Sequence, residues 1–124
     1  AKDQILKNVG VAYIDLNGLK AINDNYGHSN GDKFICTAAD TFKMVFPDNS
    51  YRIGGDEFVI IEQNIERDKY EERITALKNI MQDKQVSISI GVLWREYVDD
   101  LEELLKAADK LMYKEKEMYH NNRE

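Results

Sequence analysis

Three carboxylates occupy positions where short apolar runs give way to turns. Asp15 ends one such run, and Asp56 and Glu57 follow the pair Gly54-Gly55 between two others. Hard divalent cations such as magnesium prefer oxygen ligands, and they commonly take one or two carboxylates together with substrate phosphates. If the fold brings these side chains together, the cluster suits phosphoryl or nucleotidyl transfer. The alternative is that the acidic residues simply occupy turns, which is the commoner situation, and Gly-Gly is an ordinary hairpin turn.

Hydrophobic periodicity predicts the elements that must position these residues. Apolar and β-branched runs predict strands, whereas apolar residues spaced three and four apart predict amphipathic helices. The predicted order is βααββαβα, with strands over residues 9–15, 51–53, 58–61 and 86–93 and helices over residues 18–26, 31–46, 66–82 and from 101 onward. Helices that interrupt strands, with a hairpin in the middle, favour a single sheet with helices packed over one or both faces, an α+β fold.

Composition limits the class of protein. A chain of 124 residues fits one domain with a single core. The formal net charge of -6 disfavours nucleic acid as a partner, so that any phosphate ligand needs local cations or metal. The mean hydropathy is -0.58 and no apolar stretch approaches membrane-spanning length, so we expect no membrane contact. The lone Cys36 cannot form an internal disulfide, which is typical of a reduced, cytoplasmic protein.

The strings around the carboxylates resemble those of a known family. Gly54-Gly55-Asp56-Glu57-Phe58 between two apolar runs is similar to the signature of the GGDEF family, the bacterial diguanylate cyclases. Further matches stand at the spacing which that family uses, and they extend the resemblance from Val11 to Lys116. They are Asp15–Asp24, Tyr26–His28, Gly31–Asp32, Ser87–Val92, Ala108–Asp109, Tyr113 and Lys116. The resemblance implies a domain with a central mixed, largely antiparallel sheet flanked by helices.

The resemblance also implies an activity, the condensation of two GTP molecules into the second messenger cyclic di-GMP with release of pyrophosphate. Each domain would hold one GTP, and a transient homodimer would let each 3′-hydroxyl attack the α-phosphate of the other nucleotide. Mg²⁺ or Mn²⁺ would neutralise the phosphates and support the leaving pyrophosphate. An upstream sensor or dimerising module in the parent protein is a further implication.

Carried over position by position, the resemblance assigns roles to the acidic residues. Asp15, Asp56 and the main-chain carbonyl of Leu16 are the implied metal ligands. Asp56 is also the implied base for the 3′-hydroxyl, a role that requires hydrogen-bond reach to that group, and Glu57 assists. Gly54 and Gly55 are implied to contact the substrate.

The remaining implied site residues contact GTP. Lys20 stabilises charge on the phosphates in the transition state, and Lys116 contacts a phosphate. Asn23 and Asp32 hydrogen-bond guanine, whose N1 and N2 donors suit an aspartate, whereas adenine lacks that pair of donors. Other interpretations remain open, because Asn23 and Asp32 could cap a turn or helix and either lysine could lie on a solvated helix face.

Three features depart from the family pattern. The Arg-x-x-Asp motif of the inhibitory product site aligns with Val45–Asp48, which lacks the arginine. His120 stands where an arginine is usual, so that phosphate binding is expected to be weaker or to use Arg123. The family's segment and helix before the first strand are missing. We therefore expect residues 1–124 to be a single domain and a fragment, monomeric in dilute solution.

Two other functions stay open at the level of sequence. One is a degenerate domain that binds GTP or cyclic di-GMP and regulates a partner without catalysis. The other is a small α+β interaction module that shares only the architecture, because fold does not fix function. The joint presence of metal-binding, phosphate-binding and base residues argues against both.

Overall fold

A computed structural model describes residues 4–123 and confirms the predicted order βααββαβα. The elements are β1 (Leu6–Leu16), α1 (Leu19–Tyr26), α2 (His28–Val45), β2 (Ser50–Arg52), β3 (Glu57–Glu62), α3 (Arg67–Asp83), β4 (Ile88–Val98) and α4 (Leu101–Arg123). Two boundaries differ from the prediction in ways that affect the site. Helix α2 begins at His28, directly after Gly27, and Glu57 is the first residue of β3 and not part of the turn. Every helix within residues 4–123 is too short or too polar to span a bilayer.

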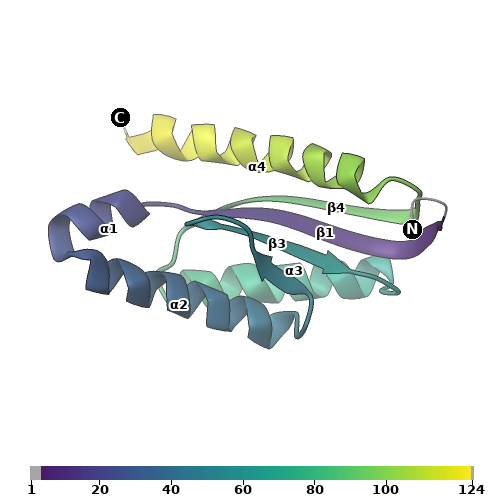
Figure 1. Cartoon of the computed structure of the whole chain (residues 1–124), viewed down its shortest axis with the longest axis horizontal. Coiled ribbons are helices and arrows are strands. Elements are labelled where there is room, and N and C mark those ends of the chain that lie inside the picture. The colour runs from purple at the N-terminus through teal and green to yellow at the C-terminus, as the bar shows by residue number, and fades with distance from the viewer. Residues whose placement is uncertain (1–3, 124) are drawn as a thin grey trace.

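The strands form one sheet in the order β2-β3-β1-β4, and the three pairings are antiparallel. This arrangement confirms the α+β prediction. Strand β1 is central, with β3 and β4 on its two sides (Figure 1). Asp15 near the end of β1 lies opposite Glu57 in β3 and opposite Ser89 in β4. The sheet therefore brings the end of β1 beside the starts of β3 and β4.

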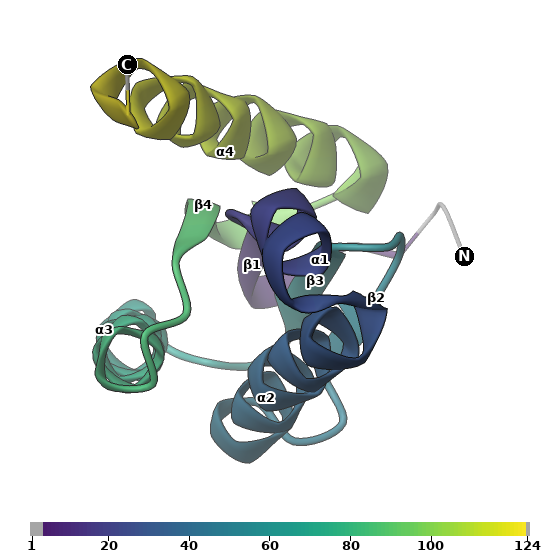
Figure 2. The ribbon, with the colours of Figure 1, turned by 90° about the vertical axis from the view of Figure 1, so that its left-hand side faces the viewer.

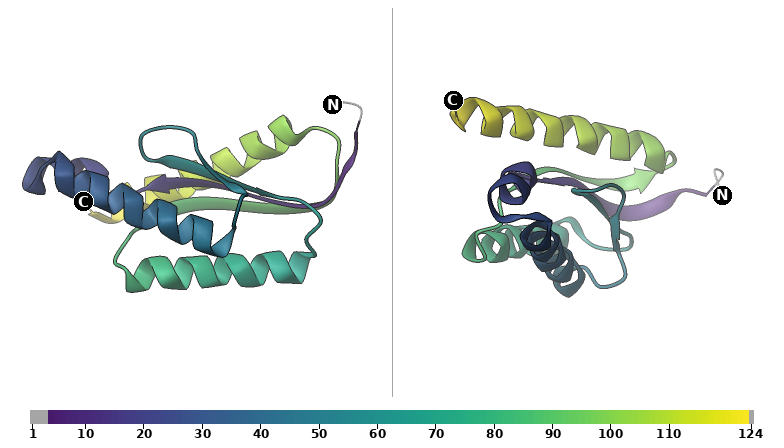
Figure 3. Two further views of the ribbon diagram at one scale, coloured as in Figure 1. Left: turned by 60° about the horizontal axis from the view of Figure 1, so that its bottom comes forward. Right: turned by 60° about the vertical axis from the view of Figure 1, so that its left-hand side comes forward.

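Helices cover both faces of the sheet. Helix α4 lies over one face, and α2 and α3 lie over the other (Figures 2 and 3). Side chains alternate between the faces along β1, as they must in a strand. Val9 and Val11 pack with Leu104 and Ala108 of α4, whereas Ala12 and Ile14 belong to the larger core under α2 and α3. Asp15 shares its side of β1 with Val9 and Val11, so its carboxylate faces α4.

Helix α4 packs directly against the backbone of β4 at Gly91. A Cβ atom at Gly91 would lie 1.9 Å from the carbonyl oxygen of Ala108 and 2.6 Å from the amide nitrogen of Met112, so only glycine permits this approach. One turn further along, the Ile90 amide donates a hydrogen bond to Glu115 Oε1 at 3.1 Å. These contacts fix the register of α4 over the sheet.

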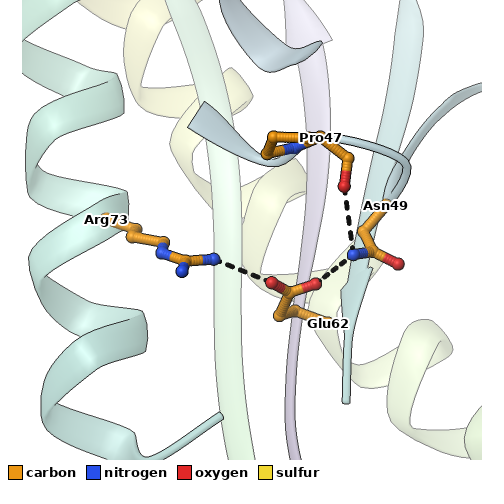
Figure 4. A network of polar contacts seen from close by, with 4 residues as sticks. All are labelled: Pro47, Asn49, Glu62 and Arg73. Atoms are coloured by element: carbon orange, nitrogen blue, oxygen red, sulfur yellow. Dashed lines mark hydrogen bonds and ion pairs between the residues drawn. The ribbon is translucent and has the colours of Figure 1, made fainter. Parts of the chain in front are cut away.

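A polar network fixes the loop that follows α2 (Figure 4). The Asn49 side-chain amide donates to the Pro47 carbonyl at 3.2 Å and also to Glu62 Oε2. The other carboxylate oxygen of Glu62 accepts from Arg73 Nη1 of α3 at 2.8 Å. The loop is thus joined to β3 and, through Glu62, to α3.

Candidate functional site

Asn17 fixes the turn between β1 and α1. Its side chain is buried, and it joins β1 to β4 by accepting from Ser89 Oγ at 2.9 Å and donating to Ser87 Oγ at 3.0 Å. The Asn17 amide donates to the Ser87 carbonyl at 2.9 Å, and the Leu16 amide donates to the Asp56 carbonyl at 2.9 Å. Asn17 was not predicted as a site residue. In the sequence, Asn17 is a polar residue directly after a buried strand. That position alone does not distinguish a structural role from a place in a solvent-exposed turn.

Asp15 is an almost fully buried carboxylate with one cationic partner. It is 1% exposed, and its Oδ2 accepts a hydrogen bond from Lys116 Nζ at 2.7 Å. Its other oxygen, Oδ1, is buried and has no hydrogen-bond partner within residues 4–123. Burial raises the pKa of Asp15, the Lys116 hydrogen bond opposes that change, and the nearby Asp56 carboxylate raises the pKa further. The two aspartates that the sequence predicts as metal ligands therefore lie close enough to interact.

Glu57 adds a third carboxylate beside this pair. It begins β3 directly opposite Asp15. Burial raises the pKa of Glu57, and the charges of Asp15, Asp56 and Asp109 raise it further. Asp109 lies on α4, and the sequence assigns it no individual role beyond a match to the family pattern. The structure adds it to the negative potential at this end of the sheet.

Arg52 holds the Gly54-Gly55 turn in place. Its Nε donates to the Gly54 carbonyl at 3.0 Å, and its Nη2 donates to the Gly55 carbonyl at 2.7 Å. The Ile53 amide closes the turn by donating to the Glu57 carbonyl at 3.0 Å. Arg52 therefore sets the path of the chain that carries Asp56, a role that the sequence pattern did not reveal.

A pocket of about 400 Å³ opens between the β1–α1 turn, α1 and α4. Leu16, Lys20, Asp56 and Lys116 are all among the residues that line it. Four predicted site residues, two of them cations, thus face one space. His120 also lines the pocket, whereas the side chain of Arg123 lies outside the described part of the chain.

Asn23 and Asp32 do not line this pocket; Asn23 lies on α1 against Gly31 of α2, the residue before Asp32. Helix α2 approaches α1 so closely that a Cβ atom at Gly31 would lie 1.8 Å from Asn23 Oδ1. Asn23 Oδ1 is buried and has no hydrogen-bond partner in the part of the chain that the structure describes. Asp32 is exposed in α2, and the residue before that helix is Gly27, so Asp32 is not the helix cap that the sequence left open.

The donor set at Asp15 and Asp56 fits a hard divalent cation. Within residues 4–123, no three His, Cys, Asp or Glu side chains lie close enough to hold an ion by themselves. Two neighbouring carboxylates, one with a buried oxygen that no donor contacts, nevertheless offer oxygen ligands of the kind that Mg²⁺ or Mn²⁺ would combine with main-chain carbonyls, water and phosphate.

Asp15 makes stability depend on pH in a defined direction. Its folded-state pKa is raised above 3.8, so the folded protein binds this proton more tightly than the unfolded chain. That contribution to stability is complete below the unfolded pKa and is lost as the pH rises through the folded pKa. We expect the free energy of unfolding of the unaltered protein, minus that of Asp15→Asn, to decrease as the pH rises above the unfolded-state pKa of about 4. Urea denaturation in the presence of a chelator measures this difference, and a flat profile would contradict the prediction.

Known proteins share both the sequence and the fold of this chain. Residues 1–122 match the family model described as "Diguanylate cyclase, GGDEF domain". The chain is 38% identical over 124 residues to the signaling protein YkoW of Bacillus subtilis (strain 168), covering 89% of this chain and 15% of that protein. It is 34% identical over 116 residues to the diguanylate cyclase DgcS of Shewanella oneidensis, covering 88% of this chain and 39% of that protein. The chain thus spans well under half the length of both relatives.

A solved structure supports the fold independently. The GGDEF domain of DgcB from Caulobacter crescentus, in complex with c-di-GMP, aligns with a TM-score of 0.79 at 21% identity. The alignment covers 90% of this chain and 73% of that chain. At this identity the likeness bears on the fold alone.

Proposed function

This chain belongs to the GGDEF domain family, and from that premise we propose that it condenses two GTP molecules into cyclic di-GMP and releases pyrophosphate. The observation that carries the proposal is the juxtaposition of Asp15 with Asp56 beside a pocket that Lys20 and Lys116 line. A protein of net charge -6 attracts a triphosphate only through such local cations or a bound metal ion.

The chain's own residues divide the chemistry among them. Lys20 and Lys116 neutralise phosphate oxygens in the pocket, from α1 and α4 respectively. Asp56 accepts the proton of the attacking 3′-hydroxyl, since of the neighbouring carboxylates Asp15, Asp56 and Glu57 it is the one that lines the pocket. Asp15, Asp56 and the Leu16 carbonyl would hold Mg²⁺ or Mn²⁺, which supplies charge neutralisation for the phosphates and the leaving pyrophosphate. Glu57 adds negative charge that favours binding of a cation.

The α1–α2 junction is the proposed guanine site. Asn23 and Asp32 offer an amide and a carboxylate, which match the donor edge of guanine and not that of adenine. Because one nucleotide is held by each domain, the reaction needs two domains face to face, and we propose a transient homodimer that other parts of the parent protein promote.

Product analysis tests the proposal. A dimeric fusion of this chain, or its parent protein, is incubated with GTP and Mg²⁺ or Mn²⁺, and the products are separated by chromatography. Formation of cyclic di-GMP and pyrophosphate supports the proposal. Tight GTP binding without product under every dimerising condition would instead support a regulatory domain.

We further expect weak feedback inhibition by cyclic di-GMP through the loop after α2. Residues 45–48 carry no arginine, and bidentate recognition of phosphate depends on the arginine fork. The arginine that the loop network does contain, Arg73, is paired with Glu62 at 2.8 Å. Initial rates measured against added cyclic di-GMP should change little, and Asp48→Ala should behave like the unaltered protein. Strong noncompetitive inhibition that disappears in Asp48→Ala would overturn this prediction.

A further inference from the structure

Lys116 binds one of the two carboxylate oxygens that Asp15 could offer to a cation. Its Nζ lies 2.7 Å from Oδ2 of Asp15, a residue that is 1% exposed. The same lysine lines the pocket that Lys20 and Asp56 share. One ammonium group therefore borders both the buried carboxylate and the space proposed for the triphosphate.

We propose that Lys116 is an internal counter-ion, which must leave Asp15 before a divalent cation binds there and which then pairs with the nucleotide phosphates. The inference rests on the proposed function, because it takes Asp15 as a metal ligand and the pocket as the triphosphate site. It adds that cation binding at Asp15 and nucleotide binding in the pocket are coupled through Lys116.

The burial of Asp15 explains why its carboxylate is paired with a lysine. An ionised carboxylate out of contact with water is costly unless a charge of opposite sign pairs with it. Within residues 4–123, the contact with Lys116 is the one ion pair that Asp15 makes. The neighbouring Asp56 has the same sign of charge and cannot supply this partner.

The structure also lets the ammonium group move while the helix stays in place. The Lys116 side chain is 33% exposed, and its charge stands at the end of a flexible four-carbon stem. The helix backbone is held by its close approach to Gly91 and by the hydrogen bond between Ile90 and Glu115. Rotation about side-chain bonds can therefore move Nζ away from Asp15 without any displacement of the helix.

Exchange of this kind couples the two ligands. A nucleotide that attracts Lys116 frees Asp15 to bind the cation. The nucleotide therefore strengthens cation binding in two ways, by coordinating the ion with its phosphates and by freeing Asp15. By thermodynamic reciprocity, the cation strengthens nucleotide binding by the same factor.

Substitution of single lysines distinguishes competition between Lys116 and the cation for Asp15 from a general effect of removing positive charge near the site. Mn²⁺ binding is measured by electron paramagnetic resonance on the unaltered protein and on Lys116→Gln, Lys20→Gln and Lys114→Gln. Lys20→Gln removes the same charge from the same pocket without freeing Asp15, and Lys114 is exposed on α4 two residues away. Without nucleotide, we expect Lys116→Gln to bind Mn²⁺ about tenfold more tightly than the unaltered protein, within the usual range for coupled sites. The two control variants should each change the affinity by less than about twofold.

Addition of a non-hydrolysable GTP analogue supplies the second comparison. The analogue should tighten Mn²⁺ binding more in the unaltered protein than in Lys116→Gln, where Asp15 is already free. If Lys116→Gln binds Mn²⁺ no more tightly than Lys20→Gln, the exchange is refuted while the metal site stands. If no variant binds Mn²⁺ with or without the analogue, both the metal site and the exchange are refuted.

A measurement on the unaltered protein keeps the inference testable if Lys116→Gln does not fold. In nuclear magnetic resonance spectra of the lysine ammonium groups, Mg²⁺ without nucleotide should shift the Lys116 signal more than the Lys20 signal. An unchanged Lys116 signal at a Mg²⁺ concentration that saturates the site would overturn the proposal.

Discussion

Asp56→Asn is expected to lower the rate of cyclic di-GMP formation by about a thousandfold, because it removes both a proton acceptor and one of two cation-binding carboxylates. Asp56 lines the pocket and lies beside Asp15, so its charge is present where the substrate hydroxyl and the cation would meet. The asparagine side chain has nearly the same shape but cannot accept the proton. Initial rates with saturating GTP and Mn²⁺, followed by chromatography of the products, measure the loss.

The fold of Asp56→Asn should be intact. The Leu16 amide donates its hydrogen bond to the main-chain carbonyl of Asp56, which the substitution leaves in place. We expect the free energy of unfolding to change by less than about 1 kcal/mol. Asp40→Asn is the matched control, since Asp40 is exposed on α2 and away from the pocket, and it should retain full activity. An Asp56→Asn variant with a tenth or more of the original rate would exclude Asp56 as the base.

The sequence predicts that Asp15 and Asp56 lie together only on the condition that the predicted hairpin pairs with the first strand. Asp15 ends an apolar run and Asp56 follows a glycine pair, so the two converge if the hairpin pairs with the first strand. Periodicity locates strands but does not specify their neighbours. The pairing of β1 with β3, which places Asp15 opposite Glu57, satisfies the condition.

The contact between Lys116 and Asp15 could not be predicted in the same way. The two residues are 101 positions apart, and their meeting depends on how far α4 is displaced along β4. The sequence singles out Lys116 only because it matches the family pattern, and an exposed position on a helix remained an alternative. The observed pair, with Asp15 buried, excludes a fully solvated position for this lysine.

The start of α2 shows a different limit of sequence reasoning. The apolar stripe that marks the helix begins near Phe34, and residues 28–30 before it are polar and exposed. A helical turn without an apolar face gives no periodic signal, so the prediction began the helix at Gly31, whereas it begins at His28. The same late start left a capping role open for Asp32, which in fact lies inside the helix.

Gly91→Ala is expected to destabilise the protein by about 3 kcal/mol, at the upper end of the usual range for overpacking. The added methyl group would lie 1.9 Å from the Ala108 carbonyl oxygen and 2.6 Å from the Met112 amide nitrogen. Both are main-chain atoms in the middle of α4, so they cannot rotate away as a side chain could. Urea denaturation monitored by circular dichroism measures the change. Gly55→Ala is the control, since a Cβ atom there would meet nothing within 4 Å, and it should unfold like the unaltered protein.

The same substitution tests whether the packing of α4 positions the site. If α4 moves away from β4 to relieve the contact, Lys116 moves with it, and its 2.7 Å contact with Asp15 lengthens. Gly91→Ala should therefore weaken the ion pair even at temperatures where the protein stays folded, and the Lys116 ammonium resonance should shift toward that of an exposed lysine. Loss of stability with an unchanged Lys116 signal would show that the helix accommodates the methyl group locally. In that case, the close approach at Gly91 would serve stability alone, and the position of Lys116 would depend on other contacts of α4, such as the hydrogen bond from Ile90 to Glu115.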